Sequence, residues 1–241
     1  MTSEQKDMDI DIVKTIEIFD NTIETIAMYY KYLHLGFFYT QLSKRVDLSP
    51  DAMNIYIGSG SNPYILEKQL IQNYLKDIYN ESPKSDVFPH LILNNAIRGI
   101  SMAMFEALRS KEIRTLFSDI IFSGDSEGFN NFYEITKFIR HTFSHNMRDS
   151  IELKRSDYEG NSWNQINRLT NKGKSSINFF FDYAQSPIQI MISNYTLKID
   201  VELDRIQDGV IYTDIISEYQ TLSFIEFCYN SMVCIRGKLI W

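Results

Sequence analysis

The sequence contains few of the residues that small or secreted proteins use as covalent or metal staples. Its 241 residues include only two cysteines, Cys228 and Cys234, which lie six apart near the C-terminus. A zinc ribbon, a redox motif or a disulfide framework requires a CxxC spacing or a second pair, and neither is present. We therefore expect two buried thiols in a protein of the reducing cytoplasm.

The chain also lacks a long uninterrupted apolar run. The richest stretch, MYYKYLHLGFFY, is broken by Lys31 and His34 and is shorter than the roughly 20 residues that a membrane span needs. The N-terminal segment MTSEQKDMDIDIVK is acidic, whereas a signal peptide begins with basic residues and an apolar core. These absences predict a protein that is neither secreted nor inserted in a membrane.

Glycine-rich nucleotide-binding fingerprints and internal repeats are missing as well. The segment GSGS at 58–61 lacks the lysine and the following Ser or Thr of a phosphate-binding loop, so it is read as a turn. By contrast, aromatic residues are plentiful, with 16 Phe and 15 Tyr. This apolar material is enough for one large globular body without metal or disulfide support.

The spacing of apolar residues predicts a mainly helical N-terminal part. Between Ile12 and Phe37 they recur at alternating steps of four and three, which is typical of a long helix at about 9–45. Asn62 and Pro63 form a helix-start signal. The further helices that we expect lie at about 62–80, 87–110 and 111–122, and after the loop SGDSEG a last one extends to about Ser150.

Beyond residue 155 the pattern changes. The stretch DYEGNSWNQINRLTNKGKSS is polar and is read as a long exposed excursion. IQIMI, LKIDVEL and VIYTDII have the character of strands, with an Asp208-Gly209 hairpin turn before the last of them. The tail LSFIEFCYNSMVCIRGK is helical in pattern. We predict a mainly α fold in which a helical domain at 1–155 carries 156–241, comprising the excursion, a small antiparallel sheet and a C-terminal helix.

The stretch FIRHTFSHNMRD, residues 138–149, concentrates two of the four histidines and two of the ten arginines. Arg140 and His145 are separated by four residues, and the polar His141 directly follows the arginine. This pattern, near the end of a helix in a helical chain, resembles the R-x4-6-H motif of HEPN domains. These are helical, nucleic-acid-associated domains that are common in prokaryotic defence and toxin systems, and the resemblance covers about residues 1–150 at the level of architecture.

The resemblance implies a function, because many HEPN domains are metal-independent ribonucleases that act as homodimers. It implies RNA as the substrate, no cofactor, no metal, and Arg140 and His145 as the catalytic pair. Among the neighbouring polar residues, His141 orients the motif, and the expected substrate contacts are made by the set His141, Ser144, Asn146 and Arg148. A toxin or defence role in the cytoplasm follows from the same resemblance.

The residue types suit this chemistry. Cleavage of RNA through its own 2′-hydroxyl needs no activated water, but it needs a proton carrier and a cation. An imidazole titrates near pH 6.5, so His145 can move a proton at neutral pH. The guanidinium of Arg140 is always charged and can donate paired hydrogen bonds to phosphate oxygens.

The helix imposes a geometrical condition on this pair. Residues five apart on a straight helix differ by about 140° in direction, so Arg140 does not stack on His145. Members of the family solve this by dimerising, so that two motifs face each other across a cleft. The resemblance implies the same here, with an inactive monomer.

Other interpretations stay open. His141, His145 and Asp149 share one helical face and could ligate a metal, although no Glu directly follows His141 as it does in HExxH. His145 could instead stabilise the helix end within a non-catalytic binding or regulatory module. Met147 stands where one toxin branch has a tyrosine that its antitoxin modifies, so that particular regulation is not expected here, whereas another regulatory protein partner is.

Charge is distributed unevenly around the motif. The window 136–174 holds eight basic and four acidic residues, a net charge of +4. Because the whole chain has a net charge of −7, the residues outside the window have a net charge of −11. This asymmetry favours a polyanion near the motif. Trp163 in the same window could stack a base or anchor the excursion to the core.

Overall fold

The computed structural model describes residues 3–42, 55–57, 64–66, 87–145, 151–153, 161–188 and 195–239. The fold is mainly helical, with a small two-stranded antiparallel sheet and a C-terminal helix, as predicted. None of the described helices combines the length and the apolar character needed to cross a bilayer. The α-helices are α1 (Ser3–Leu42), α3 (Val87–Ala107), α4 (Lys111–Leu116), α5 (Ser126–His145), α6 (Asn161–Asn171) and α7 (Glu218–Leu239).

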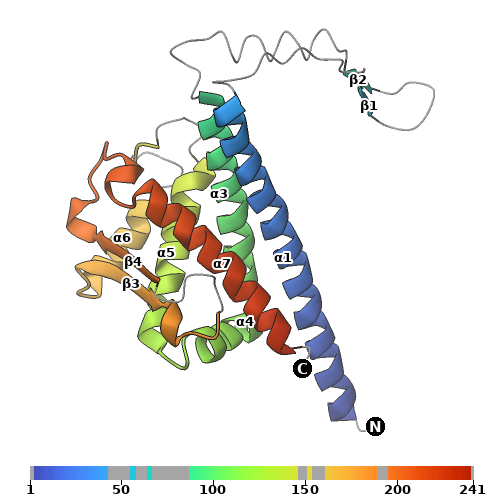
Figure 1. Cartoon of the computed structure of the whole chain (residues 1–241). Helices are drawn as coiled ribbons and strands as arrows, with labels where there is room; N and C mark the ends of the chain where they lie inside the picture. The colour runs from blue at the N-terminus through green and yellow to red at the C-terminus, as the bar shows by residue number, and fades with distance from the viewer. Residues whose placement is uncertain are drawn as a thin grey trace.

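Four of these helices form a layer. α1 packs against α3, α3 against α5, and α5 against α6, while α7 crosses this layer obliquely (Figure 1). The predicted stripe of α1 is confirmed, since Phe19, Ile26 and Leu33 recur every seven residues and are all buried. The N-terminal end of α1 extends past the C-terminal end of α7 (Figure 1).

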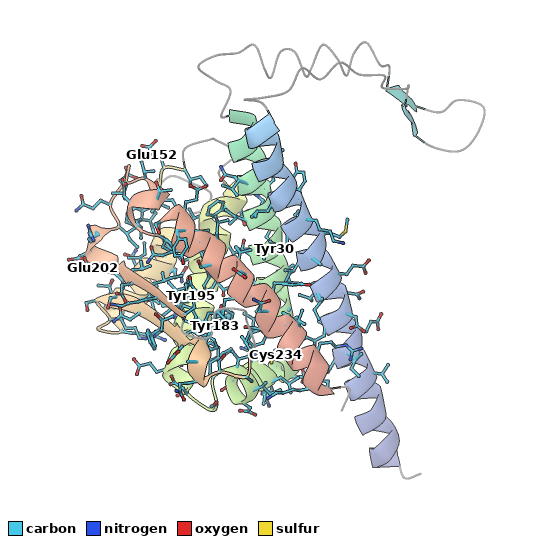
Figure 2. The ribbon with its side chains drawn as sticks, in the orientation of Figure 1. Tyr30, Glu152, Tyr183, Tyr195, Glu202 and Cys234 are labelled. Atoms are coloured by element: carbon cyan, nitrogen blue, oxygen red, sulfur yellow. The ribbon has the colours of Figure 1, made fainter. Side chains whose placement is uncertain are left out.

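α7 is fastened to α1 at two points. The Arg236 guanidinium donates to both carboxylate oxygens of Asp20, at 2.6 and 3.1 Å, and this hydrogen bonding lowers the pKa of Asp20. Nearer the middle of the molecule, the rings of Tyr30 and Tyr229 stack at 5.7 Å. Figure 2 shows Tyr30 between the two helices. The C-terminal helix is therefore an integral part of the bundle.

The small sheet differs from the predicted one. LKIDVEL does form a strand, β4 (Thr196–Glu202), but its partner is β3 (Ser176–Asp182), which the sequence reading missed. The predicted strand VIYTDII is wrong: Ile211 makes one isolated bridge with Glu152, and a 3-10 turn follows at Tyr212–Asp214. The turn before it exists, since Gly209 has a φ of 89° that suits glycine, but it joins no hairpin of two strands.

Two other predictions are also wrong. The polar stretch after residue 155 is not wholly an exposed excursion, because it contains α6, which buries Gln165, Ile166 and Leu169. Residues 64–66, predicted as helix, form β2 (Tyr64–Leu66) and pair with β1 (Ile55–Ile57). The remainder of the expected 62–80 helix, the GSGS turn and most of IQIMI lie outside the described residues.

The other boundaries agree more closely. The expected helix at 111–122 is found as α4 followed by a π-helical turn, η1 (Phe117–Ile121). α5 is described up to His145, and its expected extension to Ser150 lies outside the described residues. Cys228 is buried and Cys234 is half-buried, and both are free thiols.

A cluster of aromatic rings joins the elements into one core, and Phe132 of α5 lies at its centre. Its ring is 5.6 Å from Phe117 in η1, 6.0 Å from Phe179 in β3, and 5.4 Å from Phe227 in α7. The core therefore combines residues from both sides of position 155. Burial of these large apolar rings is the main favourable contribution to folding here.

We expect Phe132→Ala to lower the free energy of unfolding by about 3–5 kcal/mol, because it leaves a cavity at the junction of four elements. Phe180→Ala is the matched control, since Phe180 lies on β3 with 57% of its surface exposed, and should change stability by about 0.5 kcal/mol or less. Urea unfolding followed by circular dichroism measures both. A second transition confined to the C-terminal elements would contradict a shared core.

Candidate functional site

The sequence-predicted motif lies on the last turns of α5. This helix starts at an N-cap, where Oδ1 of Asp125 accepts hydrogen bonds from the backbone N–H groups of Glu127 and Gly128, both at 3.1 Å. The predicted apolar stripe is confirmed by the burial of its members, Phe132, Ile135, Ile139 and Phe143. With that stripe in the core, the opposite side of α5 is free to present polar residues.

Arg140 is half-buried and fixed by an aromatic ring from α3. Its Cζ atom lies 5.1 Å from the centroid of the Phe105 ring, within the range of a cation–π contact. Phe105 in turn stacks on Tyr133, with centroids 5.9 Å apart and planes inclined by 26°. The guanidinium is thus held in place, and no carboxylate among the described residues forms an ion pair with it.

His141 contacts the same guanidinium. Nη1 of Arg140 lies 3.2 Å from Nδ1 of His141. Because arginine can only donate, this hydrogen bond requires a lone pair on Nδ1, and therefore a neutral ring with its proton on Nε2. Only 9% of the His141 surface is exposed, which suits an orienting role for this residue better than direct contact with a ligand.

The remaining motif residues are placed unevenly. Oγ of Ser144 donates to the backbone oxygen of Arg140 at 2.5 Å, which commits its proton to the helix. His145 is the last described residue of α5, and its side chain lies outside the described part of the structure, as do Asn146 and Arg148. The structure therefore brings Arg140, His141 and Ser144 together and leaves the distance from Arg140 to the His145 imidazole untested.

A second arginine supports the end of the helix, and the sequence reading missed it. Nε of Arg98 in α3 donates to the backbone oxygen of Phe143 at 2.7 Å, and Nη1 donates to Asn95 at 3.3 Å. A cation here suits the carbonyl-rich C-terminus of α5. Arg98 thus steadies the turn that carries His145. The one available signal was an arginine inside the otherwise apolar pattern of 87–110.

Lys137 lies one helical turn before Arg140 and is half-buried. Burial lowers the pKa of its amine, and the nearby guanidinium groups of Arg168 and Arg140 lower it further, while Glu134 acts in the opposite direction. Within the described residues the amine makes no hydrogen bond or ion pair. Its positive charge is therefore disfavoured in the protein alone, and a bound anion would stabilise it.

Glu134, the acidic residue that acts on Lys137, is already paired. Glu134, whose side chain is 13% exposed, accepts hydrogen bonds from Nη2 of Arg168 at 2.6 Å and from Nε2 of Gln165 at 2.8 Å. Both partners belong to α6, so this contact fastens α6 along α5. The Glu134 carboxylate is thus engaged by Arg168, and among the described residues no carboxylate forms an ion pair with Lys137 or Arg140.

Trp163, the candidate base-stacking residue of α6, is half-buried and packs against the hydrophobic core. This contact favours the anchoring interpretation over base stacking.

Within the described residues there is no group of three or more His, Cys, Asp or Glu side chains that could hold a metal ion. The set His141, His145 and Asp149 is not tested by this finding, because it includes side chains outside the described part.

We expect Arg168→Ala to lower the free energy of unfolding by about 2 kcal/mol, since it leaves a mostly buried carboxylate without its guanidinium partner. Arg109→Ala is the matched control, because the Arg109–Glu106 pair is well exposed on both sides and should contribute about 0.5 kcal/mol or less. Urea unfolding measures both variants. Equal stabilities for the two would contradict the proposed fastening of α6.

Comparison of the whole chain with protein-family models, with curated proteins and with solved structures found no significant match. The functional interpretation therefore rests on the residues and contacts described above.

Proposed function

We propose that this protein is a metal-independent endoribonuclease of the HEPN type, active as a cytoplasmic homodimer in defence or toxin-type RNA restriction. The observation that carries the proposal is the state of Arg140. Its guanidinium is held by Phe105 and His141, has Lys137 one turn away, and has no carboxylate partner among the described residues. A fixed cation that can contact a phosphate is one of the groups that cleavage of a phosphodiester uses, because it stabilises the charge of the transition state.

The reaction uses the substrate's own nucleophile. The 2′-oxygen of one ribose attacks the adjacent phosphorus, a P–O2′ bond forms, and the P–O5′ bond breaks. The products are a 2′,3′-cyclic phosphate and a free 5′-hydroxyl. An imidazole at position 145 takes the 2′-hydroxyl proton or supplies one to the leaving 5′-oxygen, and Arg140 stabilises the negative charge that develops on the phosphate oxygens.

Three contacts prepare Arg140 for this role. The ring of Phe105 packs on the guanidinium, and Nδ1 of His141 accepts a hydrogen bond from it. Oγ of Ser144 donates a hydrogen bond to the backbone oxygen of Arg140. A guanidinium has five N–H donors, so several remain available for phosphate oxygens. A cation already fixed in position loses little entropy when the transition state forms.

The arginine and the histidine of one helix differ by about 140° in direction, which supports a site shared by two copies. Each copy then supplies Arg140 to one side of a common cleft and His145 to the other. The second candidate is a non-catalytic helical module. The observation behind it is that Arg140 is half-buried and packs on Phe105, because these contacts also stabilise the fold.

The first test is cleavage of single-stranded RNA in the presence of EDTA. We expect cleavage that leaves 2′,3′-cyclic phosphate ends, identified by mass spectrometry. His145→Ala should lower the rate by about 10²- to 10⁴-fold, and Arg140→Ala should also impair cleavage while both variants keep the helical circular dichroism spectrum. Arg109→Ala, an exposed arginine, serves as the control and should cleave normally.

Binding of RNA by the folded wild-type protein without any cleavage would instead identify the non-catalytic module. Cleavage that EDTA abolishes and Mn²⁺ or Zn²⁺ restores would point to the metal interpretation.

The second test is complementation between two inactive variants. When Arg140→Ala and His145→Ala subunits are mixed and allowed to exchange, half of the dimers are mixed, and each contains one complete site if the sites are shared. Random exchange should therefore restore about a quarter of wild-type activity. If Arg140 and His145 of the same chain act together, the mixture stays as inactive as its components.

A further inference from the structure

The contacts around Arg140 continue along the surface between α3 and α5. Arg140 lies over Phe105, Phe105 stacks on Tyr133, and Tyr133 is one helical turn before Lys137 on α5. Lys137 is in turn one helical turn before Arg140. We refer to these four residues, Phe105, Tyr133, Lys137 and Arg140, as the α3–α5 strip. Each of them is half-buried, so each is held by the fold and still reaches the surface.

The strip carries two cations side by side. Neighbours three apart on a helix have Cβ atoms about 5–6 Å apart, so Lys137 and Arg140 can reach adjacent phosphate groups of one strand. Glu134, the acidic residue closest to them in sequence, already pairs with Arg168 and Gln165 of α6. Two neighbouring cations of this kind attract a polyanion even though the whole chain is acidic.

The strip also carries two aromatic rings beside the cations. Tyr133 packs partly against the core, and its hydroxyl makes no hydrogen bond with any described residue. Proteins that bind single-stranded nucleic acid combine such rings, on which bases stack, with cations that follow the phosphates. In an A-form duplex the bases are stacked inside the helix and are not available to a ring.

We propose that the α3–α5 strip binds single-stranded RNA, with Lys137 contacting the phosphate next to the one at Arg140 and Tyr133 stacking on a base. This inference rests on the proposed ribonuclease function and narrows its substrate to single strands. It assigns roles to two residues, Lys137 and Tyr133, that lie outside the R-x4-H motif.

The test is binding rather than cleavage. A fluorescent 2′-O-methyl oligoribonucleotide lacks the free 2′-hydroxyl and cannot be cut by this reaction, so fluorescence anisotropy on the full chain measures affinity alone. The same strand is also used as a duplex and in an abasic form of equal charge. The variants are Lys137→Gln and Tyr133→Leu, and thermal unfolding confirms that each is folded.

Lys14→Gln is the matched control, because Lys14 is exposed on α1 and the substitution removes the same charge. We expect Lys137→Gln to weaken binding several-fold and to reduce the slope of log Kd against log salt by about 0.7, the effect of one lost phosphate contact on a single strand. Lys14→Gln should leave the affinity and the slope unchanged.

Tyr133→Leu should weaken binding of the single strand at least about fivefold, the effect of one lost stacked base, without changing the salt slope. On the abasic strand, wild type and Tyr133→Leu should bind equally. Wild type should prefer the single strand to the duplex by a similar factor.

Unchanged affinity and slope in Lys137→Gln, or equal affinity for single strand and duplex, would overturn the inference. The inference would also be overturned if the wild-type protein did not bind the oligonucleotide but bound an acidic peptide through Lys137, because the α3–α5 strip would then be a protein-binding surface.

The two proposals fail separately. A protein that binds through Lys137 and Tyr133 but never cleaves unmodified RNA refutes the nuclease and keeps the binding strip. If the wild-type protein cleaves RNA, and Lys137→Gln and Tyr133→Leu bind RNA as tightly as wild type, the proposed role of the α3–α5 strip is refuted and the nuclease proposal stands.

Discussion

The aromatic cluster around Phe132 is the constraint on which the rest of the structure depends. Rings from η1, β3 and α7 close around this residue, so the rotation of α5 about its own axis is set by how Phe132 fits among them. Lys137 is five residues further along and therefore lies about 140° around the helix from the core-facing side. The packing of Phe132 in the core therefore also fixes the direction of the α5 residues of the α3–α5 strip, because a helix rotates about its axis as one rigid unit.

Ion pairs and hydrogen bonds then determine the local charge on the side of α5 that carries Lys137. Glu134 is the acidic residue closest in sequence to Lys137, and its carboxylate pairs with Arg168, which fastens α6 along α5. Arg98 contacts the backbone of Phe143 and stabilises the carbonyl end of α5. Acidic residues outnumber basic ones in the chain, and some form ion pairs far from α5, such as Asp20 with Arg236 between α1 and α7. An acidic protein can in this way present a locally cationic surface.

The sequence was sufficient for features that depend on local periodicity. The stripe of Phe132, Ile135, Ile139 and Phe143 defines α5 because burial of one helical face leaves a regular spacing in any context. The spacing of Phe19, Ile26 and Leu33 identified α1 in the same way. The alternation in LKIDVEL revealed β4, since a strand with one buried face alternates whatever its partner is.

Features that depend on contacts distant in sequence could not be predicted. β3 has the burial alternation of a strand, but its exposed Phe180 stands between two buried Phe residues, so the run FFF is uniformly apolar and hides the pattern. α6 does not follow from the sequence because a short helix needs only a few buried residues, and here these include the polar Gln165, which donates hydrogen bonds to Glu134. Similarly, nothing in the sequence places Phe105 under Arg140, because that contact exists only once α3 packs against α5.

The proposed RNA contact lies on the side of α5 that carries Tyr133, Lys137 and Arg140. Photocrosslinking measures this contact directly, with a single-stranded 2′-O-methyl oligonucleotide carrying 5-bromouridine and with mass spectrometric mapping of the attached peptides. The account predicts crosslinks in the α5 peptide that contains Tyr133 and Arg140, and in the α3 peptide that contains Phe105. Crosslinks confined to the exposed face of the β3–β4 sheet or to α1, with none on α5, would contradict it.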